Sequence, residues 1–126
     1  MKRFFLVLFS LFILVSFTNC SKDEINDNSW LVGIWERSTI TDNSTTVDKL
    51  VFRTNNTGLK INTINFDSGE VISSASEFNW ELMDNTITLS EDAVYVTYLI
   101  NTEQQLVLAT QDEPPFNKVS DSTLKY

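Results

Sequence analysis

The chain contains no histidine and a single cysteine, Cys20, among its 126 residues. Without histidine, a Ser-His-Asp triad, a Cys-His pair and a histidine-rich zinc site are all excluded. Without a second cysteine, no disulfide forms within the chain, so its stability must come from packing. Basic residues are also scarce, with 9 Lys and Arg against 17 Asp and Glu, and the net charge is −8. A surface this acidic disfavours nucleic acid and anionic lipid headgroups as partners.

Catalysis would depend on carboxylates, hydroxyls and lysines, and no spacing of these residues indicates a reaction. Glu77 and Glu81 share one face of an expected strand. They would lie about 13 Å apart, whereas the paired carboxyls of glycosidases are separated by ~5–9.5 Å. The acidic stretches at 42–48 and 91–92 lack the spaced oxygens and the glycine of a calcium loop. We therefore expect no enzyme activity, no metal site and no cofactor.

The first 19 residues have the pattern of an export signal. Lys2 and Arg3 precede an apolar run over residues 4–15 that only Ser10 interrupts. A helix that spans a bilayer needs ~20 apolar residues, so the run is too short for a permanent anchor. The pattern predicts a removable signal peptide over residues 1–19.

This run, followed by Cys20, resembles the signal peptide of bacterial lipoproteins. In that family the signal is cut before the cysteine, which carries acyl chains such as palmitate. The resemblance therefore implies lipidation at Cys20 and a stable membrane anchor through the acyl chains. The alternative is a buried thiol that stands beside an export signal by chance.

The residues after the cysteine are polar and predict a flexible acidic tether over residues 20–29. Ser21-Lys22-Asp23-Glu24 resembles the signal that directs Bacteroidetes-type lipoproteins to the cell surface. The resemblance implies a protein anchored in the outer membrane and facing the cell exterior. A plain solvated tether is the alternative, because four residues recur easily by chance.

From position 30 to 120 the chain consists of short β-like runs separated by turn residues at even spacing. The runs cover residues 30–40, 47–53, 59–66, 71–83, 86–89, 93–100, 106–109 and 116–119. No connection between them is long enough for a helical crossover, so neighbouring strands should pair antiparallel. The pattern predicts an all-β fold, a single eight-stranded antiparallel up-and-down barrel over residues 30–120. Residues 121–126 are expected to form a C-terminal tail.

A Gly-x-Trp motif, Gly33-Ile34-Trp35, opens the first run and resembles the start of lipocalin-like barrels, including the small ones of bacterial lipoproteins. In that family a basic residue of a late strand packs across the tryptophan. The last run, Phe116-Asn117-Lys118-Val119, is similar to the family's ending. The resemblance implies that Gly33, Trp35 and Lys118 close one end of the barrel.

Alternation along the strands suggests which side chains face a ligand. Arg37 shares a face with Trp35, and Phe78 shares one with Trp80. A partly buried arginine beside aromatic rings could pair with the carboxylate or phosphate of an amphipathic ligand. The candidate ligand-binding residues are Trp35, Arg37, Phe78, Trp80, Tyr95 and Tyr98. In the alternative, Arg37 pairs with an acid at the barrel rim or stacks on a ring, and side chains fill the interior.

Two functions stay open at this point. The first is non-catalytic binding of a small apolar or amphipathic molecule, at an opening lined by Arg37, Trp80 and Tyr95. The second is a protein-interaction module, such as a hydrolase inhibitor or an accessory subunit of a surface complex. That module would use an exposed apolar patch, on the outer side of residues 93–100 or beside Pro114 and Pro115. Because residues 93–100 are apolar on both faces, we expect their outer face to be covered.

Overall fold

A computed structural model describes residues 28–124 and 126 of the chain. The expected signal peptide, the lipidation site Cys20 and most of the tether lie outside the described residues. Residues 28–124 and 126 form strands and turns, and they contain no helix long and apolar enough to span a bilayer.

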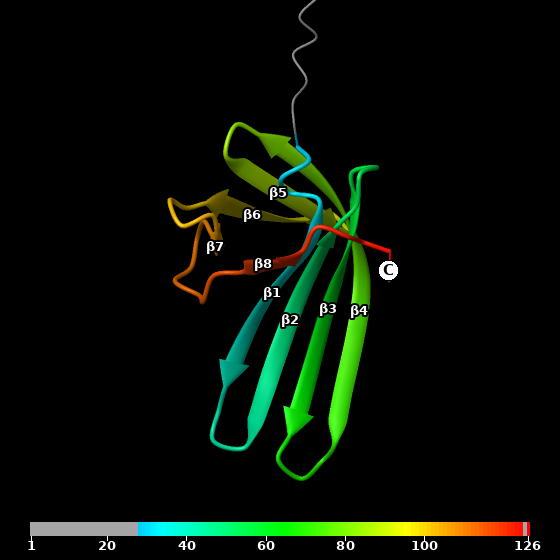
Figure 1. Ribbon diagram of the computed structural model, residues 1–126, viewed down its shortest axis with the longest axis vertical. Coiled ribbons are helices and arrows are strands. Elements are labelled where there is room, and N and C mark those ends of the chain that lie inside the picture. The colour runs from blue at the N-terminus through cyan, green and yellow to red at the C-terminus, as the bar shows by residue number, and fades with distance from the viewer. Residues whose placement is uncertain (1–27, 125) are drawn as a thin grey trace, which may run out of the picture.

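Eight strands form one antiparallel sheet (Figure 1). In chain order they are β1 (Gly33–Ile40), β2 (Ser44–Phe52), β3 (Thr57–Phe66), β4 (Val71–Met83), β5 (Thr86–Glu91), β6 (Val94–Ile100), β7 (Leu106–Leu108) and β8 (Asn117–Ser120). From β1 to β7 each strand pairs with the next, and β8 returns to pair with β1. The predicted all-β, up-and-down arrangement of eight strands is confirmed.

A single bridge closes the sheet into a barrel. Leu106 N donates to Phe116 O at 3.0 Å, and Phe116 N donates to Leu106 O at 2.8 Å. Pro114 and Pro115 directly precede Phe116 and have no N–H to extend the ladder further back. The barrel is therefore nearly closed, which is consistent with the lipocalin-like arrangement that the sequence resembles.

The barrel interior is filled largely by aromatic and aliphatic side chains from the inward-facing positions of the strands. Phe52 packs edge-to-face against both Phe78 and Trp80, with ring centroids 5.5 and 5.8 Å apart. Such pairs each contribute about 0.5–1.5 kcal/mol beyond the area they bury. The buried cluster consists of Leu31, Trp35, Leu50, Phe52, Phe78, Trp80, Ile87, Leu89, Tyr98, Leu106 and Phe116.

Trp35 closes one end of this core. Its Nε1 donates to Leu31 O at 2.9 Å, and Lys118 Nζ lies 5.9 Å from its ring centre. Gly33 has a φ of 139°, and a Cβ there would collide with the carbonyl oxygen of Ser120, just where β8 meets β1. Only glycine tolerates both the backbone angle and the close approach. The structure thus places Gly33, Trp35 and Lys118 together, as the family resemblance implies.

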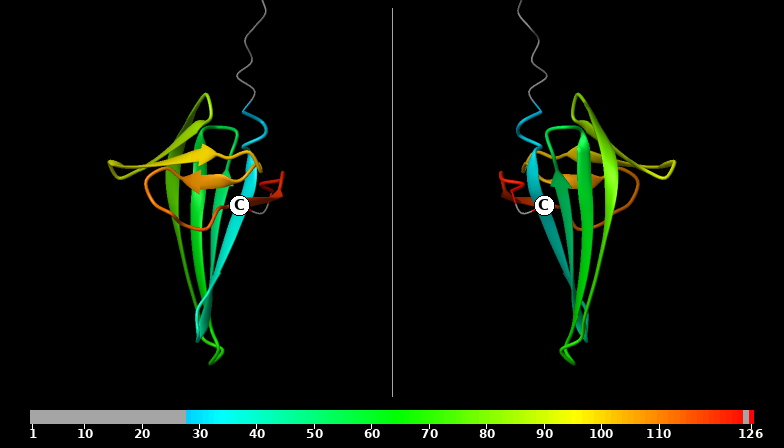
Figure 2. Two further views of the ribbon diagram at one scale, coloured as in Figure 1. Left: turned by 90° about the vertical axis from the view of Figure 1, so that its left-hand side faces the viewer. Right: turned by 90° about the vertical axis from the view of Figure 1, so that its right-hand side faces the viewer.

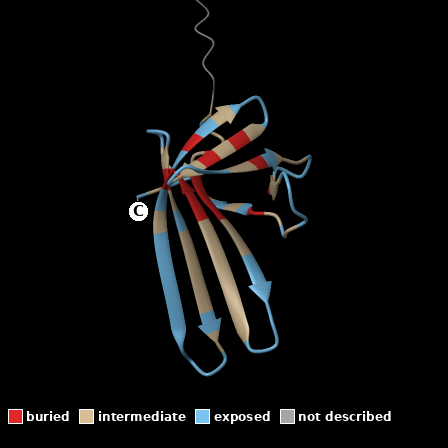
Figure 3. Cartoon of the chain, turned by 180° about the vertical axis from the view of Figure 1, so that it is seen from behind, coloured by how far each residue is buried: buried red, intermediate tan, exposed pale blue. Residues whose placement is uncertain are grey.

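The first four strands are longer than the last four and project beyond the barrel (Figures 1 and 2). β4 pairs with β5 only over Asn79–Met83, and β1 pairs with β8 only over Ile34–Glu36. Residues 37–40, 44–49, 61–66 and 71–77 of these strands form a four-stranded extension, whose side chains are exposed or half-buried (Figure 3). Closure therefore removes sheet edges within the barrel, while the extension keeps two.

The outer face of β6 is uncovered, so the expectation that another segment shields it is wrong. Tyr95 is 71% exposed and Leu99 is 40% exposed, whereas Tyr98, which faces inward, is only 7% exposed. Val and Tyr are favoured in strands for their fit to a pleated surface as well as for burial. An apolar run on both faces of a short strand therefore does not require two covered faces.

Candidate ligand cavity

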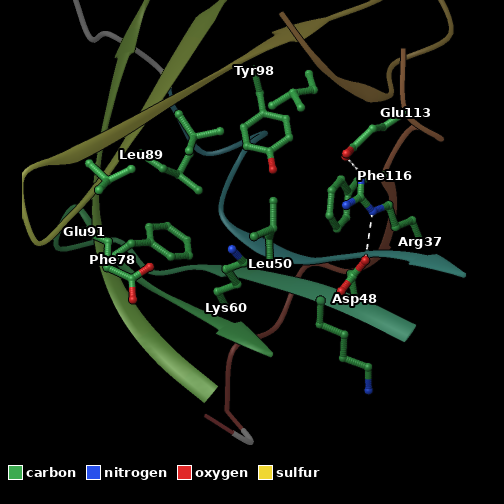
Figure 4. Close-up of a pocket in the computed structure, with 14 residues that line it drawn as sticks. Arg37, Asp48, Leu50, Lys60, Phe78, Leu89, Glu91, Tyr98, Glu113 and Phe116 are labelled. Atoms are coloured by element: carbon green, nitrogen blue, oxygen red, sulfur yellow. Dashed lines mark hydrogen bonds and ion pairs between the residues drawn. The ribbon is translucent and has the colours of Figure 1, made fainter. Parts of the chain in front are cut away.

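A cavity of about 300 Å³ lies in the barrel where β1–β4 pass into the extension (Figure 4). Protein sites for small molecules begin at about this volume. Most of the wall is apolar, and it is formed by Leu50, Phe78, Leu89, Val94, Val96, Leu108 and Phe116, with Tyr98 among them. Six charged residues complete the lining: Arg37, Asp48, Lys49, Lys60, Glu91 and Glu113.

Arg37 is held by a network that joins three strands to the loop before β8. Its Nε donates to Asp48 Oδ2 at 3.0 Å, and its Nη1 donates to Glu113 Oε2 at 2.8 Å. Asp48 lies directly opposite Arg37 on β2, and its other carboxylate oxygen accepts a hydrogen bond from Asn62 of β3 at 2.6 Å. The guanidinium also lies over the ring of Phe116, 4.5 Å from its centre. The pairing with an acid and the stacking on a ring, considered as alternatives to ligand binding, both occur.

These contacts decide the charge state of Arg37. Burial alone would lower the pKa of the guanidinium, but the hydrogen bonds and charges of Asp48 and Glu113 outweigh burial and raise it. Arg37 is therefore a permanent cation that two protein carboxylates already neutralise. The acidic group of a ligand would have to compete with both carboxylates for Arg37. Arg37 is therefore not the group we expect to bind a ligand carboxylate first.

The Tyr98 hydroxyl points into the cavity and makes no hydrogen bond with any described residue (Figure 4). Its ring packs edge-to-face on Phe116, with centroids 5.9 Å apart. Burial raises the pKa of the phenol; the charge of Arg37 lowers it, and those of Glu113 and Asp48 add to the increase. Tyr98 is thus a neutral hydrogen-bond donor, directed at the empty part of the site.

Lys60 is a cationic group on the cavity wall that the sequence reasoning missed. It lies on the inward-facing side of β3, opposite Leu50 of β2, and its ammonium group is directed into the cavity (Figure 4). It forms no ion pair or hydrogen bond with the described residues. Its neighbours Leu59 and Ile61 are apolar, so residue type alone does not show that the lysine faces inward. Strand register identifies its direction: Lys60 lies opposite Leu50, which lies opposite Trp35, and residues opposite one another in a sheet point to the same face.

Of the six predicted ligand-binding residues, the structure brings Arg37, Phe78 and Tyr98 to the cavity. Trp35 and Trp80 are buried in the core and do not line it; Trp80 Nε1 donates to Thr57 O at 2.9 Å. Tyr95 is on the outside of β6. The prediction that Trp80 and Tyr95 line the opening is therefore wrong. Trp80 packs in the core, and Tyr95 faces the side of β6 opposite to Tyr98 because side chains alternate along a strand.

No three acidic or cysteine side chains converge on a possible metal position within residues 28–124 and 126. Comparisons with family models, with curated proteins and with solved structures find no match to this chain. The chemistry of the cavity is therefore the basis for assigning a function.

Proposed function

We propose that the barrel binds a small amphipathic molecule, whose apolar body occupies the cavity and whose acidic group is held by Lys60 and Tyr98. One observation carries this proposal: a largely apolar cavity is lined by the buried Tyr98 phenol and by the solvent-accessible Lys60 ammonium group, and no described residue engages either of them. A few placed polar groups within an apolar wall are typical of ligand sites.

The charges around the cavity favour an acid with a single anionic group. Lys60 supplies an unpaired positive charge, and Tyr98 supplies a neutral donor to the same space. Asp48 and Glu113 are occupied by Arg37, whereas Glu91 also lines the cavity and forms no ion pair with a described residue. Glu91 would repel a second anionic group placed near it. We therefore favour a monoanion with a compact hydrocarbon body.

Binding of octanoate, compared with uncharged 1-octanol, tests the proposal. Residues 21–126 are titrated with each compound by isothermal calorimetry, and native mass spectrometry of the gently purified protein reports any molecule already bound. The proposal expects octanoate to bind in the cavity and octanol to bind more weakly. Val96→Phe narrows the cavity and should lower the affinity for octanoate. Thr97→Phe is the control, because Thr97 is the next residue of β6 and does not line the cavity. Equal binding of octanoate by all three proteins would refute a cavity site.

A second candidate function is a protein-interaction module without chemistry of its own. It is favoured by the outer face of β6, where the side chains of Tyr95 and Leu99 are both exposed. Tyrosine is enriched at protein interfaces because its ring is large and its hydroxyl tolerates water. Loss of a partner from Tyr95→Lys protein, with octanoate binding unchanged, would favour this function.

We also propose that the barrel is anchored through an acylated Cys20 in the outer membrane and faces the cell exterior. The support is the sequence resemblance of residues 1–24 to surface-directed lipoproteins. Labelling cells with an alkyne analogue of palmitate should mark the wild-type chain and leave Cys20→Ser unmarked. Equal labelling of both chains would contradict acylation at Cys20, and protection of the labelled chain from external protease would contradict surface exposure.

A further inference from the structure

The extension leaves one long strand edge without a partner among the described residues. β4 pairs with β5 only from Asn79 onward, so residues 71–78 pair with β3 on one side and with no described strand on the other. The stretch forms the outer border of the extension in Figure 1. Its register with β3 is unbroken by any bulge. A regular edge of this length can accept another strand.

The backbone groups that this edge offers can be assigned from two hydrogen bonds. Trp80 N donates to Asn56 O at 2.9 Å, and Glu70 O accepts from Phe66 N at 2.9 Å. Even-numbered residues of β4 therefore direct their N–H and C=O groups to β3. Since this direction alternates along an antiparallel strand, the groups that face the open edge belong to Val71, Ser73, Ala75 and Glu77.

This edge lacks the devices by which natural proteins protect a free strand. Those devices are lysines, prolines, bulges and very short strands. Residues 71–76 contain no proline and no charged side chain. Val71 and Ile72 are 59% and 50% exposed, respectively. Residues 71–76 are thus uncharged and open, as expected of a strand that pairs with another chain.

We infer that the edge pairs with the same edge of a second copy of this chain, with the two β4 strands antiparallel about a two-fold axis. In such an interface the same residues serve as both halves, so identical edges satisfy each other. With the axis at Ser74, Val71 opposes Glu77 of the second copy, and Ser73 opposes Ala75. All four outward-facing residues then exchange backbone hydrogen bonds, because each opposes another outward-facing residue.

Charge favours a second copy over a charged peptide as the occupant. The chain has a net charge of −8, yet residues 71–76 are neutral. In the register centred on Ser74, the flanking acids Glu70 and Glu77 oppose Phe78 and Val71, so no two carboxylates face each other. A peptide charged along its whole length would find no complementary charge on residues 71–76, whereas a second copy brings a matching neutral segment.

Disulfide trapping tests this pairing in the full-length chain, purified in a non-ionic detergent with Cys20→Ser as background. Cysteine is introduced at Ser74 or, as a control, at Ser68 in the exposed turn between β3 and β4. Ser74 lies on the axis and opposes itself, and opposed Cα atoms are ~4.5–5.5 Å apart, which is close enough for a disulfide. The pairing predicts a covalent dimer for Ser74→Cys and a monomer for Ser68→Cys. Monomers for both, or equal dimer yields for both, would overturn it.

A second measurement asks whether the edge itself holds the two copies together. Ala75→Pro removes an N–H that faces the edge and leaves the hydrogen bonds to β3 in place. Ala75→Lys places a charge on the edge without restricting the backbone. It replaces the proline variant in the experiment if circular dichroism shows that the proline variant has lost its strand structure. Ser38→Lys on β1, at the opposite edge of the extension, is the matched control. Sedimentation velocity should show dimer for wild type and Ser38→Lys, and monomer for the Ala75 variant. A dimer that survives Ala75→Lys would overturn the proposal.

Discussion

Arg37 of β1 and Glu113 of the loop before β8 form an ion pair of 2.8 Å, although 76 positions separate them in the chain. The pair connects the first strand to the segment that closes the barrel. Pro114 O also accepts from Arg37 Nη1, at 3.4 Å, and Phe116 lies under the guanidinium. One side chain on the cavity wall thus holds the loop that borders the cavity.

Removing the loop's carboxylate should loosen the loop with little loss of global stability. Glu113→Gln keeps the side-chain shape and leaves Arg37 paired with Asp48. Since Glu113 is partly exposed, we expect the free energy of unfolding to fall by only about 0.5–1 kcal/mol. Hydrogen exchange of residues 109–115 should become faster, as measured by mass spectrometry. Glu103→Gln, in an exposed turn, is the control. Equal exchange of residues 109–115 in both variants would show that the Arg37–Glu113 ion pair does not restrain the loop.

Truncating Arg37 itself should be more costly. Arg37→Ala leaves Asp48 and Glu113 facing a partly buried space without their cation, and it removes the contact with Phe116. We expect a loss of about 1–3 kcal/mol in urea unfolding. Octanoate affinity should fall far less than in a Lys60 variant, provided that the protein remains folded. Arg37→Ala protein as stable as wild type would show that the network contributes nothing to stability.

Gly33 and Gly69 offer a matched pair of glycines with positive φ. Gly33 has a φ of 139° and no space for a Cβ, whereas Gly69 has a φ of 92° and open space around it. Gly69→Ala should cost about 1 kcal/mol through backbone strain alone. Gly33→Ala should cost clearly more, since the new methyl group would push Ser120 away from β1. Thermal unfolding midpoints measure the difference, and equal midpoints would contradict the close approach of β8.

Stability should decrease in alkaline solution because of Tyr98. Burial raises the pKa of this phenol, so the folded protein retains a proton that the unfolded chain releases near pH ~10. The contribution to stability is full below the unfolded pKa and is lost as the pH rises through the folded one. Urea unfolding from pH ~9 to ~11 should therefore show a smaller decline for Tyr98→Phe than for wild type. Tyr95→Phe, on the outer face of β6, is the control and should follow wild type.

Much of the fold could be predicted from local chemistry. Turn residues separated the strands correctly, and Asn56, Asp84 and Asp92 have the positive φ values that Asn and Asp tolerate in turns. Alternation placed Phe78 and Trp80 in the core. The extension could not be predicted in this way, because strand length does not reveal where the neighbouring strand stops pairing.

The candidate site was less accessible to sequence reasoning. Tyr95 and Tyr98 were equivalent by residue type, and only the register with β5 and β7 places Tyr98 inside. The inward direction of Lys60 could not be predicted from residue type, because its neighbours Leu59 and Ile61 are apolar. Glu113 comes from a loop whose approach to Arg37 depends on barrel closure. Residue types indicated a polar group in an apolar barrel, whereas the identity of the unpaired cation required the three-dimensional arrangement.

The most direct test of a binding role for the cavity is the octanoate affinity of Lys60→Met. Methionine retains the length and apolar stem of lysine and removes the charge. Lys49→Met is the control: Lys49 also borders the cavity, but it follows Asp48 and precedes Leu50 on β2, so its side chain has the opposite strand parity to Leu50, and its Nζ lies 4.0 Å from Glu36. We expect Lys60→Met to lose about tenfold or more in affinity, as for a charge-assisted contact worth ~1.5–3 kcal/mol, while Lys49→Met binds like wild type. Equal affinities in the two variants would contradict a cavity site for an amphipathic acid.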